Sequence, residues 1–560
     1  MTRVRKGFVD LPHGQVHFRY GGRGPAVVLL HGSPRSSAQH AANIEWLGEH
    51  FTVIAPDTPG NGNSTALPQA APEIPDFAGA LADALTALGI ERCGLYGYHS
   101  GAKIALRFAA DHPDRAALAV LDGLALGGEP PSRRFLERYL PAFEPTADGT
   151  YLAQQWRRAL DAHRYFPWFE RTAGTRLRRA LPDDAELHDY VTDLFMAGPH
   201  WTEAYGAALR HDAAPDLRRL RSAAVLLHRD DAVPGSSLEH LPQPLPAHCS
   251  VERVPPQLPA WRARLLEILR HAALPRGDWS PAPPRAAVGT RRSRQSYVDL
   301  VHGQLCVRLQ GEAERAAPLL LLHDVPGGSC ALRPLAEALA GDRRTITPDL
   351  PGLGESHPLP YPSLGSYVTA LAEMLERLGT GSVDVFGEGL GTCFAVALAA
   401  RHPALVRRLA LDGLPLVRLR EQRLYAKHYC PPLVPDRHGG HLLRAWGQLC
   451  DAESCWPWFD RSPAAARLRD PGLDPDALHA RLVDVMQQLP SYGDAASAAL
   501  EARVRDILRG VHQPTLLFDV AEDVRYKGTQ RAARRLADHL VVPRPTTVAA
   551  LAERLREFLA

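Results

Sequence analysis

The sequence predicts an α/β protein made of two tandem domains, each a mostly parallel, doubly wound sheet with an inserted helical cap. Short apolar runs of strand length alternate with stretches whose apolar residues recur every three or four positions, as in amphipathic helices. The same motifs occur twice in the same order, about 290 residues apart. Helical, aromatic-rich stretches at about 127–210 and 417–500 interrupt the alternation once in each copy.

In the first copy, the expected strands and helices follow one another in the order that such a sheet requires. We expect buried parallel strands at residues 26–31, 51–57, 92–97 and 117–123, and helices at residues 76–89 and 101–114. In an open sheet of this kind, ligands bind beyond the carboxyl ends of the strands, which is where the cap is expected to lie.

Motif pairs define the duplication. "FVDLPHGQVHFRY" corresponds to "YVDLVHGQLCVRL", and "YFPWFERTAGTR" corresponds to "CWPWFDRSPAAAR". "GYHSG" and "GEGLG" place His99 opposite Gly389. The predicted domains are residues 1–273 and 296–560, and a Pro-, Gly- and Arg-rich linker joins them at 274–295. Tandem copies favour packing of the two domains as a pseudodimer.

Composition excludes several classes of partner and cofactor. Lys plus Arg is 64 and Asp plus Glu is 62, so a net charge of +2 gives no reason to expect nucleic acid or an anionic membrane as a partner. The apolar runs are too short to cross a bilayer, and the basic start has no apolar segment behind it, so a cytoplasmic protein is expected. Eight scattered cysteines form no C-x-x-C pair, so neither a disulfide framework nor a metal site is expected.

The motifs resemble, in family order, those of the capped α/β-hydrolase-fold superfamily, over nearly the whole chain. "LLHGSP" at 29–34 resembles the loop that supplies an oxyanion-hole amide, and "PDTPGNGNS" at 56–64 resembles the D-x-P-G-x-G-x-S segment. "GLYGYHSGA" at 94–102 resembles the nucleophile elbow. The resemblance implies a small-molecule substrate bound under the cap, and no cofactor.

Turn geometry decides which residue of the elbow takes the reactive position. With His99 in the centre, Gly97 and Gly101 flank it at the two positions where the bend requires small residues. With Ser100 in the centre, the bulky Tyr98 would stand at one of those positions, so Ser100 is the weaker candidate. The second copy, "GEGLG", keeps the outer glycines and has glycine at the position itself.

Both copies therefore depart from the Ser-His-Asp triad. The triad needs a base that follows the last strand. In the first copy, His248 precedes that strand and His271 lies in the final helix, so neither fits. The resemblance implies a triad acid in "AAVLLHRDDAVP", with Asp230 as the better fit and Asp231 as the alternative.

The first hypothesis is enzymatic and assigns the chemistry to the first copy. His99 would act as base, acid or nucleophile, and the backbone amides of Ser33 and Ser100 would stabilise an oxyanion. Asp122 or Asp230 would orient the His99 ring. Compatible reactions are hydrolysis of an ester or lactone, an elimination, or a cyclisation that needs proton transfer.

The second hypothesis is an inactive small-molecule-binding or scaffold protein, a pseudoenzyme. For the second copy this is the default expectation, because glycine has no side chain with which to transfer a proton. A fold of this kind supports many functions, so the fold alone does not decide the matter for the first copy.

Three further residues have both a functional and a structural interpretation. His31 is a candidate oxyanion or pocket residue, although a histidine at a strand end more often bonds the backbone of its loop. Trp168 and Arg171 are candidates for substrate binding. The structural alternatives are that Trp168 belongs to the core of the cap and that Arg171 pairs with an acid.

Overall fold

The computed structural model describes residues 2–126, 130–229, 240–275, 277, 279, 293–311, 316–468 and 470–560. Packing divides the chain into two units, Met1–Glu144 with Ala153–Pro283, and Pro145–Leu152 with Pro284–Ala560. The division between Pro283 and Pro284 falls inside the segment predicted as a linker.

An eight-stranded sheet forms the centre of the first unit, as far as the described residues go. Its order is β1-β2-β4-β3-β5-β6-β7-β8; β2 pairs antiparallel with β1 and β4, and the pairs from β4 to β8 are parallel. The strands are β1 Arg5–Leu11, β2 Gly14–Gly21, β3 Ala26–Leu30, β4 Thr52–Pro56, β5 Cys93–Tyr98, β6 Ala116–Asp122, β7 Ala223–Arg229 and β8 Cys249–Val254. The helices are α1 Ala41–Leu47, α2 Ile74–Ala87, α3 Ser100–Asp111, α4 Arg133–Tyr139, α5 Thr150–Ala162, α6 Asp184–Ala197, α7 Trp201–Arg210, α8 Ala214–Arg219 and α9 Leu258–His271.

The second unit repeats this arrangement within the part of the chain that the structure describes. Its eight-stranded sheet has the order β9-β10-β12-β11-β13-β14-β15-β16, which matches the first sheet strand for strand. The strands are β9 Arg294–Leu300, β10 Gly303–Gln310, β11 Leu319–Leu322, β12 Thr345–Pro348, β13 Val383–Glu388, β14 Val406–Asp412, β15 Thr515–Asp519 and β16 His539–Pro543. The helices are α10 Arg333–Leu339, α11 Leu364–Arg377, α12 Gly391–Arg401, α13 Leu419–Tyr429, α14 Gly440–Ser454, α15 Pro475–Met486, α16 Asp494–Glu501, α17 Val504–Ile507, α18 Thr529–Ala533 and α19 Val548–Leu559. The predicted fold class is confirmed.

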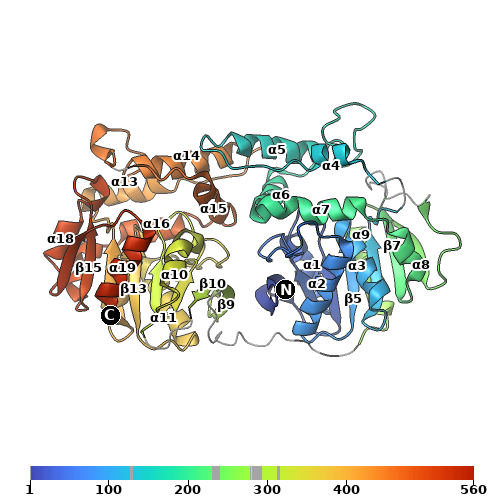
Figure 1. Cartoon of the computed structure of the whole chain (residues 1–560), viewed down its shortest axis with the longest axis horizontal. Helices are drawn as coiled ribbons and strands as arrows, with labels where there is room; N and C mark the ends of the chain where they lie inside the picture. Colours follow the sequence, from blue (N-terminus) through green and yellow to red (C-terminus); the bar gives the residue numbers. More distant parts are fainter. Residues whose placement is uncertain are drawn as a thin grey trace. The chain divides into compact units, whose positions relative to one another are not determined.

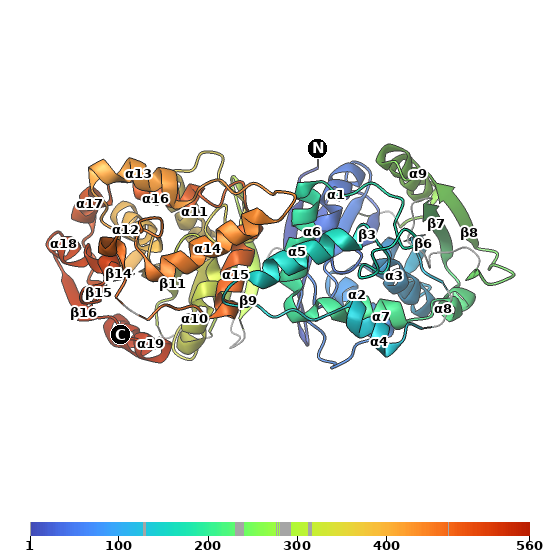
Figure 2. The same cartoon turned by 90° about the horizontal axis from the view of Figure 1, so that it is seen from above.

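Strand β3 shows why a continuous apolar run forms a strand here. Val27 and Leu29 pack into the cluster that includes α1 and α9, whereas Val28 and Leu30 pack into the cluster that includes α2 and α3. Successive side chains of a strand point to opposite faces, so a strand covered on both faces must be apolar throughout. Figure 2 shows α1 and α9 on one side of the first sheet and α2 and α3 on the other.

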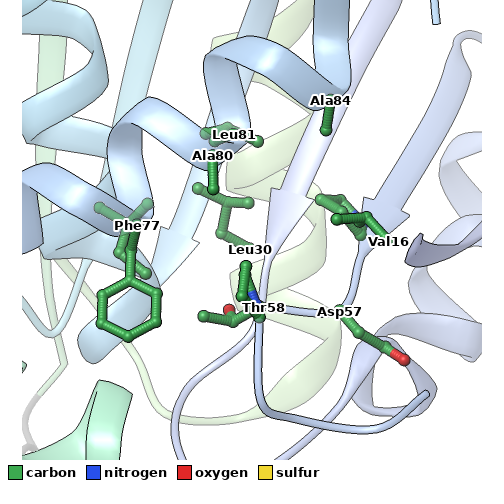
Figure 3. A pocket seen from close by; sticks show the side chains of 11 residues that line it. Val16, Leu30, Asp57, Thr58, Phe77, Ala80, Leu81 and Ala84 are labelled. Atoms are coloured by element: carbon green, nitrogen blue, oxygen red, sulfur yellow. The ribbon is translucent and has the colours of Figure 1, made fainter. Parts of the chain in front are cut away.

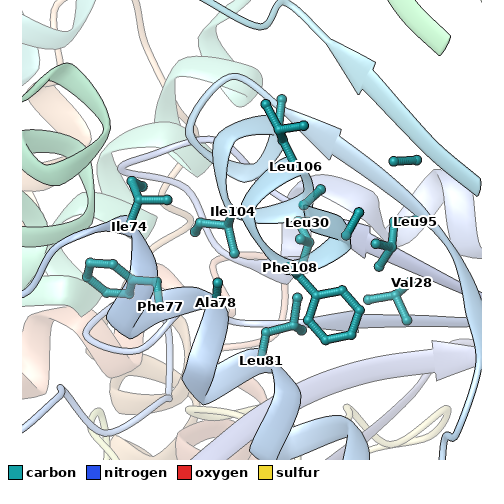
Figure 4. Close-up of a cluster of buried hydrophobic side chains, with 14 of the residues drawn as sticks. Val28, Leu30, Ile74, Phe77, Ala78, Leu81, Leu95, Ile104, Leu106 and Phe108 are labelled. Carbon is teal, nitrogen blue, oxygen red and sulfur yellow. The ribbon is translucent and has the colours of Figure 1, made fainter. Parts of the chain in front are cut away.

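The α2 side of the first sheet contains a small cavity. Val16, Leu30, Phe77, Leu81 and Ile104 are among the residues that line it (Figure 3). The same side chains belong to the large apolar cluster between the sheet and helices α2 and α3 (Figure 4). Such a lining, inside the main core, identifies the cavity as a gap in packing.

Helices α4 to α7 lie between β6 and β7 in the chain, and α13 to α16 lie between β14 and β15, where the caps are predicted. Helix α7 packs against α2 and α3, and Figure 1 shows α6 and α7 lying across one end of the first sheet. Among the described residues, we find no helix with the length and apolar character that a membrane span requires.

Candidate active site

The site lies where strand β5 turns sharply into helix α3. His99 occupies the turn with φ 50° and ψ −108°, a conformation that is strained for any residue except glycine. A Cβ on Gly97 would lie 2.3 Å from the carbonyl oxygen of Gly101, and a Cβ on Gly101 would lie 2.4 Å from that of Leu30. The two glycines thus allow the close approach of the strand and the helix, and the strained position between them belongs to His99.

The ring of His99 is held from two sides. Its Nδ1 lies 3.2 Å from the carbonyl oxygen of Gly123, and its ring centre lies 4.0 Å from that of Tyr98. Because a carbonyl group can only accept, Nδ1 carries the proton and Nε2 has the lone pair. Burial, followed by the positive charges of Arg229 and Arg179, lowers the pKa of His99 to about 4. The imidazole is therefore neutral at pH 7.

Ser100 is the first residue of α3, and its hydroxyl group faces the loop after β3. Its Oγ accepts the backbone N–H of Ser33 at 2.7 Å and lies 3.0 Å from Ser33 Oγ. Ser100 is buried. The structure therefore brings together the two residues predicted to supply the oxyanion amides, and the amide of Ser33 is engaged by Ser100.

His31 connects two loops through the backbone. Its Nδ1 lies 3.2 Å from the carbonyl oxygen of Gly32, and its Nε2 accepts the N–H of Thr58 at 2.9 Å. In the second unit, His323 makes the same two contacts, with the carbonyl group of Asp324 and the N–H of Leu350. Burial lowers the pKa of His31, which favours the neutral ring. The ring thus stabilises the loop that carries Ser33.

Asp122 ends strand β6 next to the elbow, because β5 and β6 are parallel neighbours. Its carboxylate accepts from the Tyr96 hydroxyl at 2.8 Å and from Trp261 Nε1 at 3.0 Å. Arg229, at the end of β7, lies 3.7 Å from the same carboxylate and donates to the Tyr98 hydroxyl at 2.9 Å. The Asp122 carboxylate thus contacts Tyr96, Trp261 and Arg229. His99 Nδ1 instead contacts the carbonyl oxygen of Gly123. The predicted acid Asp230, and its alternative Asp231, lie outside the described residues.

Arg229 is a site residue that sequence reasoning missed. The signal that could have found it is its place at the carboxyl end of a predicted strand, directly before Asp230.

Trp168 and Arg171 are engaged within the cap. Trp168 Nε1 donates to the carbonyl oxygen of Tyr139 at 2.9 Å, and Trp458 donates to that of Tyr429 at 2.7 Å in the second unit. Arg171 lies 2.8 Å from the carboxylate of Asp161. These contacts match the structural alternatives considered for both residues.

A group of cationic and phenolic side chains from separate elements of the first cap was also missed, because no local spacing links them. We call this group the cap cluster; it consists of Tyr139 (α4), Arg158 (α5), Arg179, Tyr190 (α6) and Tyr205 (α7). The hydroxyl groups of Tyr139 and Tyr205 lie 3.1 Å apart. Burial raises the pKa of Tyr139 to about 12 and that of Tyr190 above its ordinary value, so both remain hydroxyl donors at neutral pH.

The corresponding elbow of the second unit is filled by its own side chains. Gly389 has φ 54°, and Oδ1 of Asp324 accepts the backbone N–H groups of Leu390 at 2.8 Å and Val325 at 2.9 Å. Arg525 Nη2 lies 2.5 Å from Oδ2 of the same carboxylate. Burial opposes the charge of Asp324, but Arg525 and the two amides hold its pKa below the ordinary value. These amides belong to the residues that correspond to Ser100 and Ser33.

Comparison with known proteins finds a matching family model and several similar proteins. A family model described as the alpha/beta hydrolase fold matches residues 25–195 and again residues 317–429. A 2-hydroxy-6-oxononadienedioate/2-hydroxy-6-oxononatrienedioate hydrolase of Pseudomonas putida is 36% identical over 228 residues, which are 39% of this chain and 76% of that protein. A fluoroacetate dehalogenase of Burkholderia is 35% identical over 120 residues, 20% of this chain and 39% of that one.

Other relatives match over shorter stretches or at lower identity. An uncharacterized protein of Mycobacterium tuberculosis is 36% identical over 110 residues, 19% of this chain, and the chain spans only 32% of its length. The crystal structure of the enol-lactonase from Burkholderia xenovorans LB400 is 18% identical with a TM-score of 0.35, and the match covers 47% of this chain and 99% of that one.

Proposed function

Because the chain belongs to the α/β-hydrolase fold family, we propose that its first domain binds a small organic molecule under the cap and acts on it through His99. The reaction is hydrolysis of an ester or lactone, or a related proton transfer. One observation carries this proposal. A titratable side chain stands at the strained elbow position, where glycine would be relaxed, and strain of this kind is a common feature of functional sites.

The geometry of His99 suits a neutral base. Nδ1–H donates to Gly123, so Nε2 takes a proton from water while the water oxygen attacks the ester carbon. The proton then passes from Nε2 to the departing alkoxide, and the products are an acid and an alcohol. Arg229 and Arg179 disfavour the imidazolium, so the proton returns quickly; they also favour negative charge on the reacting carbonyl oxygen.

The second domain is, in this proposal, a degenerate copy. Gly389 has no side chain with which to react, and Asp324 occupies the two amides that would otherwise stabilise an oxyanion. A carboxylate in that position competes directly with any substrate oxygen.

The alternative function is that the whole protein binds a small molecule without transforming it. One observation in the first domain favours this alternative: the Ser33 amide already donates to Ser100 Oγ, so a substrate oxygen must displace that bond before it can be stabilised.

The test uses the full chain with 4-nitrophenyl esters and aryl lactones, and it measures product formation. His99→Ala is expected to lower kcat/KM by about 100-fold or more, as for loss of a general base. His248→Ala is the matched control, because His248 is an exposed histidine whose ring, among the described residues, bonds only the Leu220 carbonyl oxygen. Full turnover by His99→Ala would refute the role of His99, and binding without product formation would favour the alternative.

A further inference from the structure

Arg158 is a buried cation on α5 that lacks an anionic partner. The residue is only 9% exposed, its Nε donates to Gln155 Oε1 at 2.8 Å, and its guanidinium carbon lies 4.3 Å from the ring centre of Trp201. Within the described part of the chain, no group accepts a hydrogen bond from either terminal nitrogen, and Nη2 is fully enclosed. A buried charge without a partner strongly destabilises the folded protein, unless a bound anion pairs with it.

The acids of the first cap do not supply that anion. Asp161 pairs with Arg157, Arg164 and Arg171. Asp193 pairs with Arg35. Arg179 donates only to backbone carbonyl groups, those of His163 and Ala162, at 3.3 Å each. The cap cluster therefore holds two cations that, among the described residues, have no carboxylate partner.

Arg179 connects the cap cluster electrostatically with His99. Arg179 acts electrostatically on His99 and Tyr98 at the elbow, and also on Tyr190 and Tyr205, which in turn interact with Arg158. Burial is the largest cause of the pKa shift of each of these histidine and tyrosine groups, yet all four keep accessible surface.

The second cap provides an internal comparison. The position of Arg158 holds Gln448, whose amide donates to the carbonyl oxygen of Tyr429 at 2.9 Å. The bridges Tyr165–Arg176 and Cys455–Ala466 show that the two caps correspond at an offset of 290, so the position of Arg179 holds Arg469, which lies outside the described residues. By contrast, the scaffold contact of Trp168 recurs in the second cap, through Trp458. The second helical cap therefore forms without a cation at the position of Arg158, which indicates that Arg158 serves a ligand of the first domain.

We propose that Arg158, assisted by Arg179, binds the carboxylate of a small organic acid in the space between the first cap and His99. The inference rests on the proposed function, and it names the substrate class of that site: an ester or lactone that also carries a free carboxylate. The planar guanidinium presents two donors that match the two carboxylate oxygens, and hydroxyl groups of the cap cluster donate to the remaining lone pairs.

The experiment measures binding by calorimetry, with phenylacetate and the neutral phenylacetamide as probes and the full chain as the protein. The unaltered protein is expected to bind phenylacetate at least tenfold more tightly than phenylacetamide, about 1.4 kcal/mol. Arg158→Gln, which copies the second cap, is expected to remove this preference. Arg157→Gln, at an exposed arginine of the same helix, is expected to keep it.

Several outcomes overturn the proposal: no binding of phenylacetate by the unaltered protein, equal binding of the acid and the amide, or an unchanged preference in Arg158→Gln. The melting temperature of unliganded Arg158→Gln is expected to equal or exceed that of the unaltered protein, because a buried unpaired charge has been removed. A melting temperature lowered by more than about 5 °C would assign Arg158 to the scaffold and refute the proposal.

Failure of this inference is distinguishable from failure of the proposed function. His99→Ala is expected to bind phenylacetate as the unaltered protein does, whether or not turnover is found. Carboxylate binding that depends on Arg158 without turnover by the unaltered protein would refute the chemistry and keep the anion site. Turnover of 4-nitrophenyl butyrate that depends on His99, without any preference for the acidic 4-nitrophenyl hydrogen glutarate, would keep the chemistry and refute the anion site.

Discussion

The guanidinium of Arg525 lies 2.5 Å from the carboxylate of Asp324, and this ion pair fills the space in front of the second elbow. A Cβ on Gly389 would lie 2.0 Å from Arg525 Nη2 and 2.1 Å from Asp324 Oδ1. The absence of a side chain at Gly389 is therefore matched to the presence of the pair, and the two features close the site together.

Gly389→Ala is expected to destabilise the protein by about 2–4 kcal/mol, from the positive φ together with the overlap with the ion pair. Gly379→Ala is the matched control, because Gly379 has φ 61° but a Cβ on it would meet no described atom within 4 Å, so only backbone strain of about 1 kcal/mol is expected. Differential scanning calorimetry of the two variants measures the difference. Equal losses of stability in the two variants would show that the Asp324–Arg525 pair moves aside without an energetic cost.

His99→Gly is expected to be more stable than His99→Ala by about 1 kcal/mol, because glycine relaxes the φ of 50° and alanine does not. At an ordinary position the order is the reverse, since alanine loses less conformational entropy on folding. Urea unfolding of the two variants measures which of them is more stable. A more stable alanine variant would contradict the strain assigned to this position.

Stability is expected to depend on pH through His99. Its folded pKa of about 4 lies below the ordinary 6.5, so the folded state binds fewer protons than the unfolded state between these values. Stability from this group is therefore fully present above pH 6.5 and is lost as the pH falls toward 4, by no more than about 3 kcal/mol. Unfolding of the unaltered protein and of His99→Gln at pH 7, 5.5 and 4.5 isolates this contribution, and a stability difference that stays constant with pH would refute it.

Ser100 is expected to resist a fluorophosphonate probe, because its hydroxyl group is buried against Ser33 and the strained turn position belongs to His99. Mass spectrometry of the treated full chain checks this. Any turnover found for the unaltered protein is expected to persist in Ser100→Ala within about tenfold. Strong labelling at Ser100 would reverse the assignment of the reactive position.

Local patterns were enough to predict the fold. The apolar run at 26–31 predicted a buried strand, and the structure has it as β3 with both faces covered. The helix expected at 76–89 is Ile74–Ala87, and the one expected at 101–114 is Ser100–Asp111. The spacing of apolar residues predicts these elements because the backbone repeat alone decides which face of a helix or strand each side chain lies on.

The candidate site was predictable only in part. The glycine spacing around His99 identified the strained position, because the bend requires small residues at the two flanking positions. Asp122 was placed at the right strand end, but its partners Tyr96, Trp261 and Arg229 come from three other elements. No local spacing in the sequence encodes such a meeting.

The sequence by itself determined the duplicated α/β architecture and the residue at each elbow, His99 in one copy and Gly389 in the other. Only the tertiary structure decided what surrounds them: an imidazole held neutral against Gly123, and an elbow filled by Asp324 and Arg525. The physical reason is that turn sterics act over a few neighbouring residues, whereas burial and charge pairing depend on groups that lie far apart in the chain.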